Sequence, residues 1–123
     1  KESKLKIDLF NEQLAGKHMY LARFYMKKSK WVSAIKRLNI ILDRYPETIY
    51  TIEALHRLVE IYYKLGNTKL AKKYAATLGY NFNDSDWYKK TYKVVADQNY
   101  SDDTKKTKLK LREKIKNIFK LSK

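Results

Sequence analysis

Hydrophobic residues recur at helical spacing along almost the whole chain, and very few residues interrupt the pattern. The 123 residues include three glycines and one proline, too few for the turns of a β-sandwich or barrel, or for a glycine-rich phosphate loop. Cysteine is absent, so disulfides and thiol chemistry are excluded. A chain of this length can still bury a sizeable core as one domain. The sequence therefore predicts an all-α fold.

The pattern predicts five helices over residues 7–96 and a separate basic helix over residues 107–121. The first five cover residues 7–28, 29–45, 48–65, 68–78 and 84–96. Their expected N-caps include Ser29, Thr48 and Asp84 or Ser85, and their expected stops are Pro46, Gly66 and Gly79. Helices this short are marginal alone, so their apolar stripes must pack against each other. In the first helix we expect Leu14, His18, Leu21, Ala22 and Tyr25 to face inward.

A helix pair repeats along the chain. Ala34 and Ala71 are 37 residues apart, and the same shift aligns Ala22 with Val59. Small residues at these positions would let paired helices approach closely, and the period is near the ~34 of tetratricopeptide repeats. The sequence therefore predicts tetratricopeptide-like helix hairpins in a right-handed superhelical stack.

Two repeats are fewer than the roughly three that such arrays need, and the chain does not begin with methionine. We therefore expect it to be part of a longer array, the alternative being that the terminal helices act as a cap. Residues 1–96 would form the repeats and a closing helix, and residues 97–123 a polar break followed by a basic C-terminal helix.

The formal charge is +15, from 28 Lys and Arg against 13 Asp and Glu. Nine of the basic residues fall within 105–123, so the excess is concentrated in the tail. Lysine predominates over arginine, whereas base recognition favours arginine, and codon bias alone can produce a lysine surplus. A nucleic-acid partner is therefore not expected, although a basic module binding nucleic acid or an anionic membrane surface is the alternative function.

The tail carries an apolar stripe at helical spacing among the lysines, formed by Leu111, Ile115, Ile118 and Phe119. Two uses remain open. The stripe could cap the last repeat, which we favour, or lie on an anionic membrane surface. No run of residues approaches the length of an apolar membrane span.

Nothing in the sequence indicates an enzyme. His18 and His56 have no cysteine to share a metal with, so both are expected to be structural. The acidic clusters 84–86 and 102–104 precede expected helices, where short acids act as caps. We expect no catalytic residue, cofactor or metal. In a stacked-repeat protein the informative surface is the one that meets a partner, and Lys36, Arg37 and Arg44 on the second helix are the candidates.

Several stretches are more specific than a generic repeat. They are 20–28 (YLARFYMKK), 31–37 (WVSAIKR), 43–48 (DRYPET), 53–60 (EALHRLVE) and 78–88 (LGYNFNDSDWY). Over about residues 10–96 the chain resembles the C-terminal repeats of the BamD family of outer-membrane β-barrel assembly lipoproteins. Asn83 stands where that family commonly has a proline.

The resemblance implies a scaffold at the periplasmic face of the outer membrane, anchored by a lipidated cysteine upstream of Lys1. It implies docking on a periplasmic POTRA domain of BamA, where Arg37 matches a family arginine that pairs with an acid. Lys36 and Arg44 are weaker candidates by position. Other lipoproteins of the complex are further candidate partners, and the absent N-terminal repeats would receive unfolded outer-membrane proteins.

Overall fold

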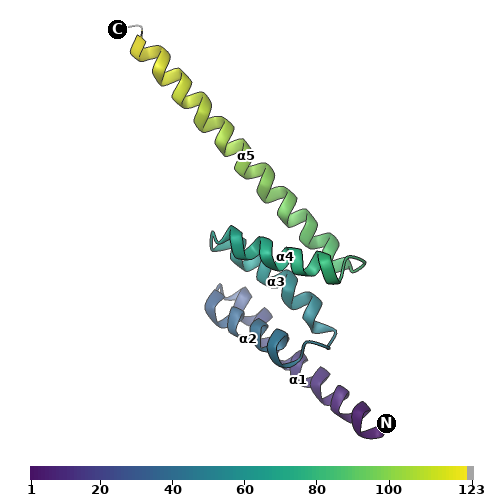
Figure 1. Cartoon of the computed structure of the whole chain (residues 1–123). Coiled ribbons are helices and arrows are strands. Elements are labelled where there is room, and N and C mark those ends of the chain that lie inside the picture. Colours follow the sequence, from purple (N-terminus) through teal and green to yellow (C-terminus); the bar gives the residue numbers. More distant parts are fainter. Residues whose placement is uncertain (122–123) are drawn as a thin grey trace.

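The computed structural model describes the backbone of residues 1–121 and the side chains of residues 1–98, 105–118 and 120. The described chain forms five helices and no strand. They are α1 (Glu2–Lys27), α2 (Trp31–Arg44), α3 (Tyr50–Lys64), α4 (Thr68–Asn81) and α5 (Asp86–Leu121). Figure 1 shows them stacked in chain order, with the two termini at opposite ends of the molecule. The all-α prediction is confirmed.

Two helix hairpins, α1 with α2 and α3 with α4, make up the array (Figure 1). Helix α3 is the central element, because it contacts α1, α2, α4 and α5. Its side chains are accordingly buried on nearly every side. The first turns of α5 pack on α3 and α4, as expected of a closing helix.

The small residues that define the repeat lie where the two helices of each hairpin meet. Ala34 in α2 and Ala71 in α4 are both fully buried, and so are Ala22 and Val59 at the matching positions of α1 and α3. A larger side chain at any of them would separate the helices. This result confirms the predicted register between the two hairpins.

The inward face of α1 differs from the prediction. Ala15 and Met19 are fully buried, whereas His18 and Leu21 are half-buried. The buried arc of α1 is the one that faces both α2 and α3. The predicted stripe through Leu14, His18 and Leu21 lies one residue, about 100°, around the helix from it, and the two share Ala22.

Four predicted helix boundaries are wrong. Helix α1 begins at Glu2, five residues before the predicted start at Ile7. Ser29 adopts the left-handed conformation (φ 56°) in the turn before α2 and does not cap it. The Thr48 hydroxyl donates to the Tyr45 carbonyl, and the N-cap of α3 is Ile49. Helix α4 continues past Gly79 to Asn81.

Two boundaries follow the sequence as expected. The Ser85 hydroxyl accepts a hydrogen bond from the Tyr88 amide at 3.1 Å, which caps α5. Gly66 follows the end of α3 with φ 81°, a conformation that glycine adopts without steric cost.

The predicted polar break at residues 97–104 is also wrong. Helix α5 runs without interruption from Asp86 to Leu121 and projects well beyond the array (Figure 1). Residues 102–104 therefore lie inside a helix and cannot cap one. The segment is polar, but it contains neither glycine nor proline, so nothing in it stops a helix. Within residues 1–121, no helix combines the length and apolar character of a membrane-crossing segment.

Candidate partner interface on the first hairpin

Arg37 lies on α2 beside the half-buried ring of His18 on α1. Its Nη1 atom is 3.3 Å from His18 Nδ1. Burial, together with the positive charges of Arg37 and Arg44, lowers the pKa of the His18 imidazole below its usual value of 6.5. The neutral imidazole can accept a hydrogen bond from the guanidinium. His18 also stacks on Tyr45, with ring centroids 6.0 Å apart. A fixed neutral ring therefore orients Arg37.

Arg37 and Lys36 line the same shallow hollow of about 280 Å³ on the α1–α2 surface, together with Tyr25, Ser33 and Ile40. The Lys36 side chain is exposed, and Arg37 is half-buried. Aromatic, aliphatic and cationic groups therefore meet in one depression. Such a combination is typical of the desolvated centre of a protein interface.

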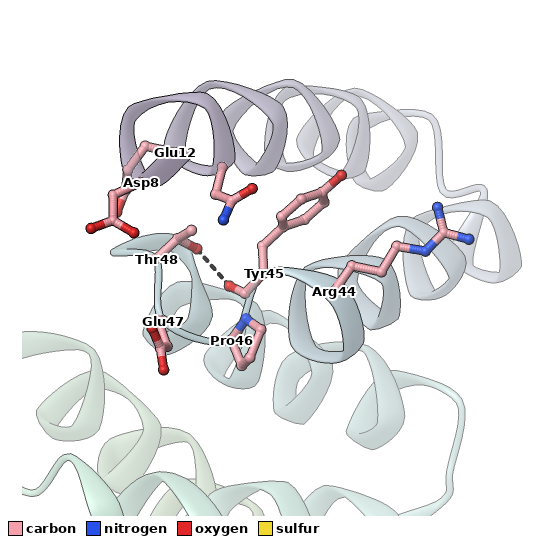
Figure 2. A pocket seen from close by; sticks show the side chains of 8 residues that line it. Asp8, Glu12, Arg44, Tyr45, Pro46, Glu47 and Thr48 are labelled. Carbon is pink, nitrogen blue, oxygen red and sulfur yellow. Dashed lines mark hydrogen bonds between the residues drawn. The ribbon is translucent and has the colours of Figure 1, made fainter. Parts of the chain in front are cut away.

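Arg44 lines a different pocket, of about 410 Å³, at the other end of the hairpin (Figure 2). This pocket also carries the carboxylates of Asp8, Glu12 and Glu47, and Figure 2 shows the Arg44 side chain extending away from them. Seven residues separate Arg44 from Arg37, about two helical turns. The three predicted residues therefore share one helix but not one cavity.

The other two arginines of the array are already paired with glutamates. Glu53 is 4% exposed and accepts from Arg23 Nε at 2.9 Å and from Arg57 Nε at 3.3 Å. A second Arg23 nitrogen contacts the other carboxylate oxygen. Burial raises the pKa of Glu53, but hydrogen bonding and the positive charges of both arginines outweigh it, and the pKa is lowered overall.

In contrast, Arg37, Arg44 and Lys36 form no ion pair with any carboxylate in the described part of the chain. The array therefore has two classes of arginine. Arg23 joins α1 to Glu53 of α3, and Arg57 pairs with Glu53 and Glu60 within α3, whereas Arg37 and Arg44 present charge that no described acid neutralises.

His56 belongs to the internal polar network. It is 4% exposed, with Nε2 2.9 Å from Glu60 and Nδ1 2.7 Å from the Thr91 hydroxyl of α5. Burial raises the pKa of Glu60, but its contacts with His56 and Arg57 outweigh this and lower it. The described residues contain no cluster of three or more metal-ligating side chains.

Sequence reasoning missed this tie between α3 and α5. The spacing of His56 and Glu60, four residues apart on one helix, could have revealed their contact within α3. Thr91, at 1% exposed, carried no comparable signal.

The predicted tail residues lie far along α5. Leu111, Ile115 and Ile118 are 54%, 51% and 65% exposed, so they do not cap the last repeat. The favoured capping prediction is wrong, because the continuous helix carries these residues away from the array instead of folding back. The side chain of Phe119 lies outside the described residues.

Comparison with known proteins agrees with this architecture. A family model described as outer membrane lipoprotein (YfiO) matches residues 1–78. The outer membrane protein assembly factor BamD of Rickettsia prowazekii is 49% identical over 94 residues, which are 76% of this chain and 38% of that protein. The BamD of Caulobacter vibrioides is 43% identical over 96 residues, 78% of this chain and 32% of that protein.

More distant relatives carry the same name. The Xylella fastidiosa BamD is 30% identical over 88 residues, 72% of this chain and 30% of that protein. The chain thus spans about a third of the length of the curated relatives it matches. The family model covers more than half of the chain, from α1 to within the last turn of α4, so this chain belongs to the outer membrane lipoprotein family YfiO.

Proposed function

We propose that this chain is a scaffold segment of the outer-membrane β-barrel assembly machinery, located at the periplasmic face of the outer membrane. It would dock a periplasmic POTRA domain of BamA through the first hairpin and so help the insertion of outer-membrane proteins. Its relatives are assembly factors by name, and its family is one of outer membrane lipoproteins. A stacked-repeat fold suits a scaffold, since it offers extended surfaces to partners.

The observation that carries this proposal is the state of Arg37. The guanidinium is half-buried and held by a neutral histidine, and no described carboxylate pairs with it. Because its orientation is set before binding, little side-chain entropy is lost when a partner arrives. The planar fork has donors left over for a carboxylate, which it can hold bidentately.

Lys36 and Arg44 would have secondary roles. Lys36 borders the same hollow and is exposed, so it would contribute a rim charge that raises the association rate more than the affinity. Arg44 lines another pocket, where its side chain extends away from the carboxylates (Figure 2), and it would contact a partner whose footprint extends two turns along α2.

The decisive experiment measures binding of the chain to the POTRA array of the same organism's BamA by calorimetry. We expect Arg37→Glu to weaken binding at least a hundredfold, because it places an acid against an acid at a partly desolvated contact. Helical content should stay close to the parent's, and loss of the contact with His18 should cost no more than about 1.5 kcal/mol, so the variant stays folded.

Arg112→Glu is the matched control, with the same charge change on an exposed residue far along α5. It should leave the affinity unchanged. Equal binding by the Arg37→Glu variant and the parent would show that the interface lies elsewhere on the array.

A further inference from the structure

We propose that the C-terminal half of α5, residues 105–120, is an interfacial helix that lies on an anionic lipid surface. This proposal goes beyond docking on a POTRA domain and does not depend on it. It rests on an exposed apolar stripe, on the direction in which that stripe faces, and on the charge around it.

The stripe consists of Leu111, Ile115 and Ile118, spaced i, i+4 and i+7 on one side of the helix, and each is more than half exposed. Figure 1 shows this part of α5 clear of every other helix. Three large aliphatic side chains in a row are thus left without a partner in the described structure.

The stripe does not continue the face through which α5 packs on the array. At 3.6 residues per turn, the buried Thr91 lies about 160° around the helix axis from Leu111. The side that meets α3 and α4 is therefore nearly opposite the stripe. Because α5 is one continuous helix, the repeats could cover this stripe only if α5 were broken.

The charge around the stripe identifies the surface it fits. Residues 105–120 contain eight basic residues and one acid, Glu113. Lys108 and Lys114 flank the stripe, each about 60° from Leu111 around the axis. Lysines in this position can extend their stems along the apolar layer and keep their ammonium groups at phosphate level. A second copy of the same helix would be repelled, whereas a layer of anionic headgroups is complementary.

The phosphates of a nucleic acid could bind the lysines but would make no contact with an aliphatic stripe. The presence of both the stripe and the lysines therefore favours a lipid surface. Both explanations predict that removing lysines weakens binding. Only the lipid explanation predicts that replacing a residue of the stripe weakens binding. The stripe is therefore the part to test.

The test uses the full chain and vesicles of phosphatidylethanolamine with about a third phosphatidylglycerol, measured by co-sedimentation at 0.15 M salt. Vesicles of phosphatidylcholine alone serve as the neutral comparison. We expect binding to the anionic vesicles and little to the neutral ones. Lys108→Gln combined with Lys114→Gln should weaken binding about 25-fold, since each basic residue near the surface contributes about a factor of five.

Ile115→Asn should weaken vesicle binding about tenfold, because it removes one aliphatic side chain from the buried stripe. The matched control is Leu109→Asn. Leu109 is 58% exposed but lies on the opposite side of the helix from Leu111, so this variant should bind like the parent. Both variants exchange one exposed aliphatic residue for asparagine in the same helix, so any common loss of helicity cancels.

The absence of cysteine allows a direct check of orientation. An environment-sensitive dye attached through Ile115→Cys should shift to shorter wavelength on vesicles, while the same dye attached through Leu109→Cys should not.

Three results would overturn the proposal. The first is equal vesicle binding by the parent and the Ile115→Asn variant. The second is an equal spectral shift at both labelled positions. The third is tighter binding to a 20-base-pair mixed-sequence DNA duplex than to vesicles at 0.15 M salt, which would identify a general polyanion-binding helix.

Discussion

Replacing Glu53 with its isosteric amide should lower the stability of the array, because the carboxylate charge is part of an ion-pair network. The Glu53 carboxylate is nearly inaccessible to water and accepts hydrogen bonds from arginines of two helices, α1 and α3. Glu53→Gln keeps the shape and one acceptor but removes the charge. Removing one partner of a fully buried ion pair costs about 3–5 kcal/mol.

In this chain the loss of stability should be smaller, because the guanidinium groups of Arg23 and Arg57 can be hydrated once the Glu53 charge is gone. The side chains of Arg23 and Arg57 are 47% and 27% exposed, compared with 6% for Glu53. We therefore expect Glu53→Gln to lower the free energy of unfolding by about 2 kcal/mol at pH 7. This is the energy of a hydrogen bond to a charged group and less than the loss of a fully buried ion pair. For a domain of this size the melting temperature should fall by about 8 °C.

The assay is urea unfolding followed by circular dichroism at a series of pH values. The folded pKa of Glu53 lies below the ordinary value of 4.5, so its contribution is fully present above about pH 4.5 and is lost as the pH falls through the folded pKa. The difference between parent and variant should therefore shrink toward pH 3. Glu47→Gln is the control, because Glu47 is exposed and should show no difference at either pH. A loss of equal size at pH 7 and pH 3 would refute the assignment to the carboxylate charge.

Two further outcomes follow from the same structure. The folded pKa of His18 is lowered, so the unfolded chain binds the proton more readily, and stability should rise with pH up to about 6.5 and level off above it. In urea titrations, His18→Gln should reduce the slope of unfolding free energy against pH between pH 5.5 and 6.5, and an unchanged slope would contradict the shift. Ala34→Leu should cost about 1–3 kcal/mol in thermal melting, because Ala34 is fully buried between two helices; Ala96→Leu, on the exposed side of α5, should cost less than about 0.5 kcal/mol, and equal effects would mean that the helices do not meet closely at Ala34.

The repeat register could be predicted from sequence because small residues leave a strong periodic signal. Ala34 and Ala71 are required by the close approach of paired helices, and any chain with this fold must satisfy that requirement. The inward face of α1 was harder to predict. Apolar residues follow helical spacing on two adjacent stripes, one through Leu14 and Leu21 and one through Ala15, Met19 and Ala22, and only the packing against α2 and α3 decides which is buried.

The tail shows the opposite error. A polar stretch at 97–104 was interpreted as a break, but polarity lowers helix propensity without forbidding a helix. Proline and glycine do stop helices, and neither occurs after Gly79. The capping prediction for Leu111, Ile115 and Ile118 depended on that break and failed with it.

The candidate interface could be predicted only residue by residue. The spacing places Lys36, Arg37 and Arg44 on one helix, but it does not reveal which of them line the same hollow. That depends on how α1 is rotated against α2. Likewise, nothing local reveals that Arg23 reaches Glu53, thirty residues away, while Arg37 meets a histidine instead.

Helix α3 touches every other helix of the chain. In a solenoid each repeat contacts its neighbours alone, and in an array of two hairpins and a closing helix all these contacts between units converge on the second hairpin, chiefly on α3. The first hairpin and α5 both pack on α3, so unfolding of α3 would expose both clusters of the core. We therefore expect residues 15–96 to unfold as a single cooperative unit. The far half of α5 shares none of these contacts, so it can melt and re-form while the rest of the molecule stays folded.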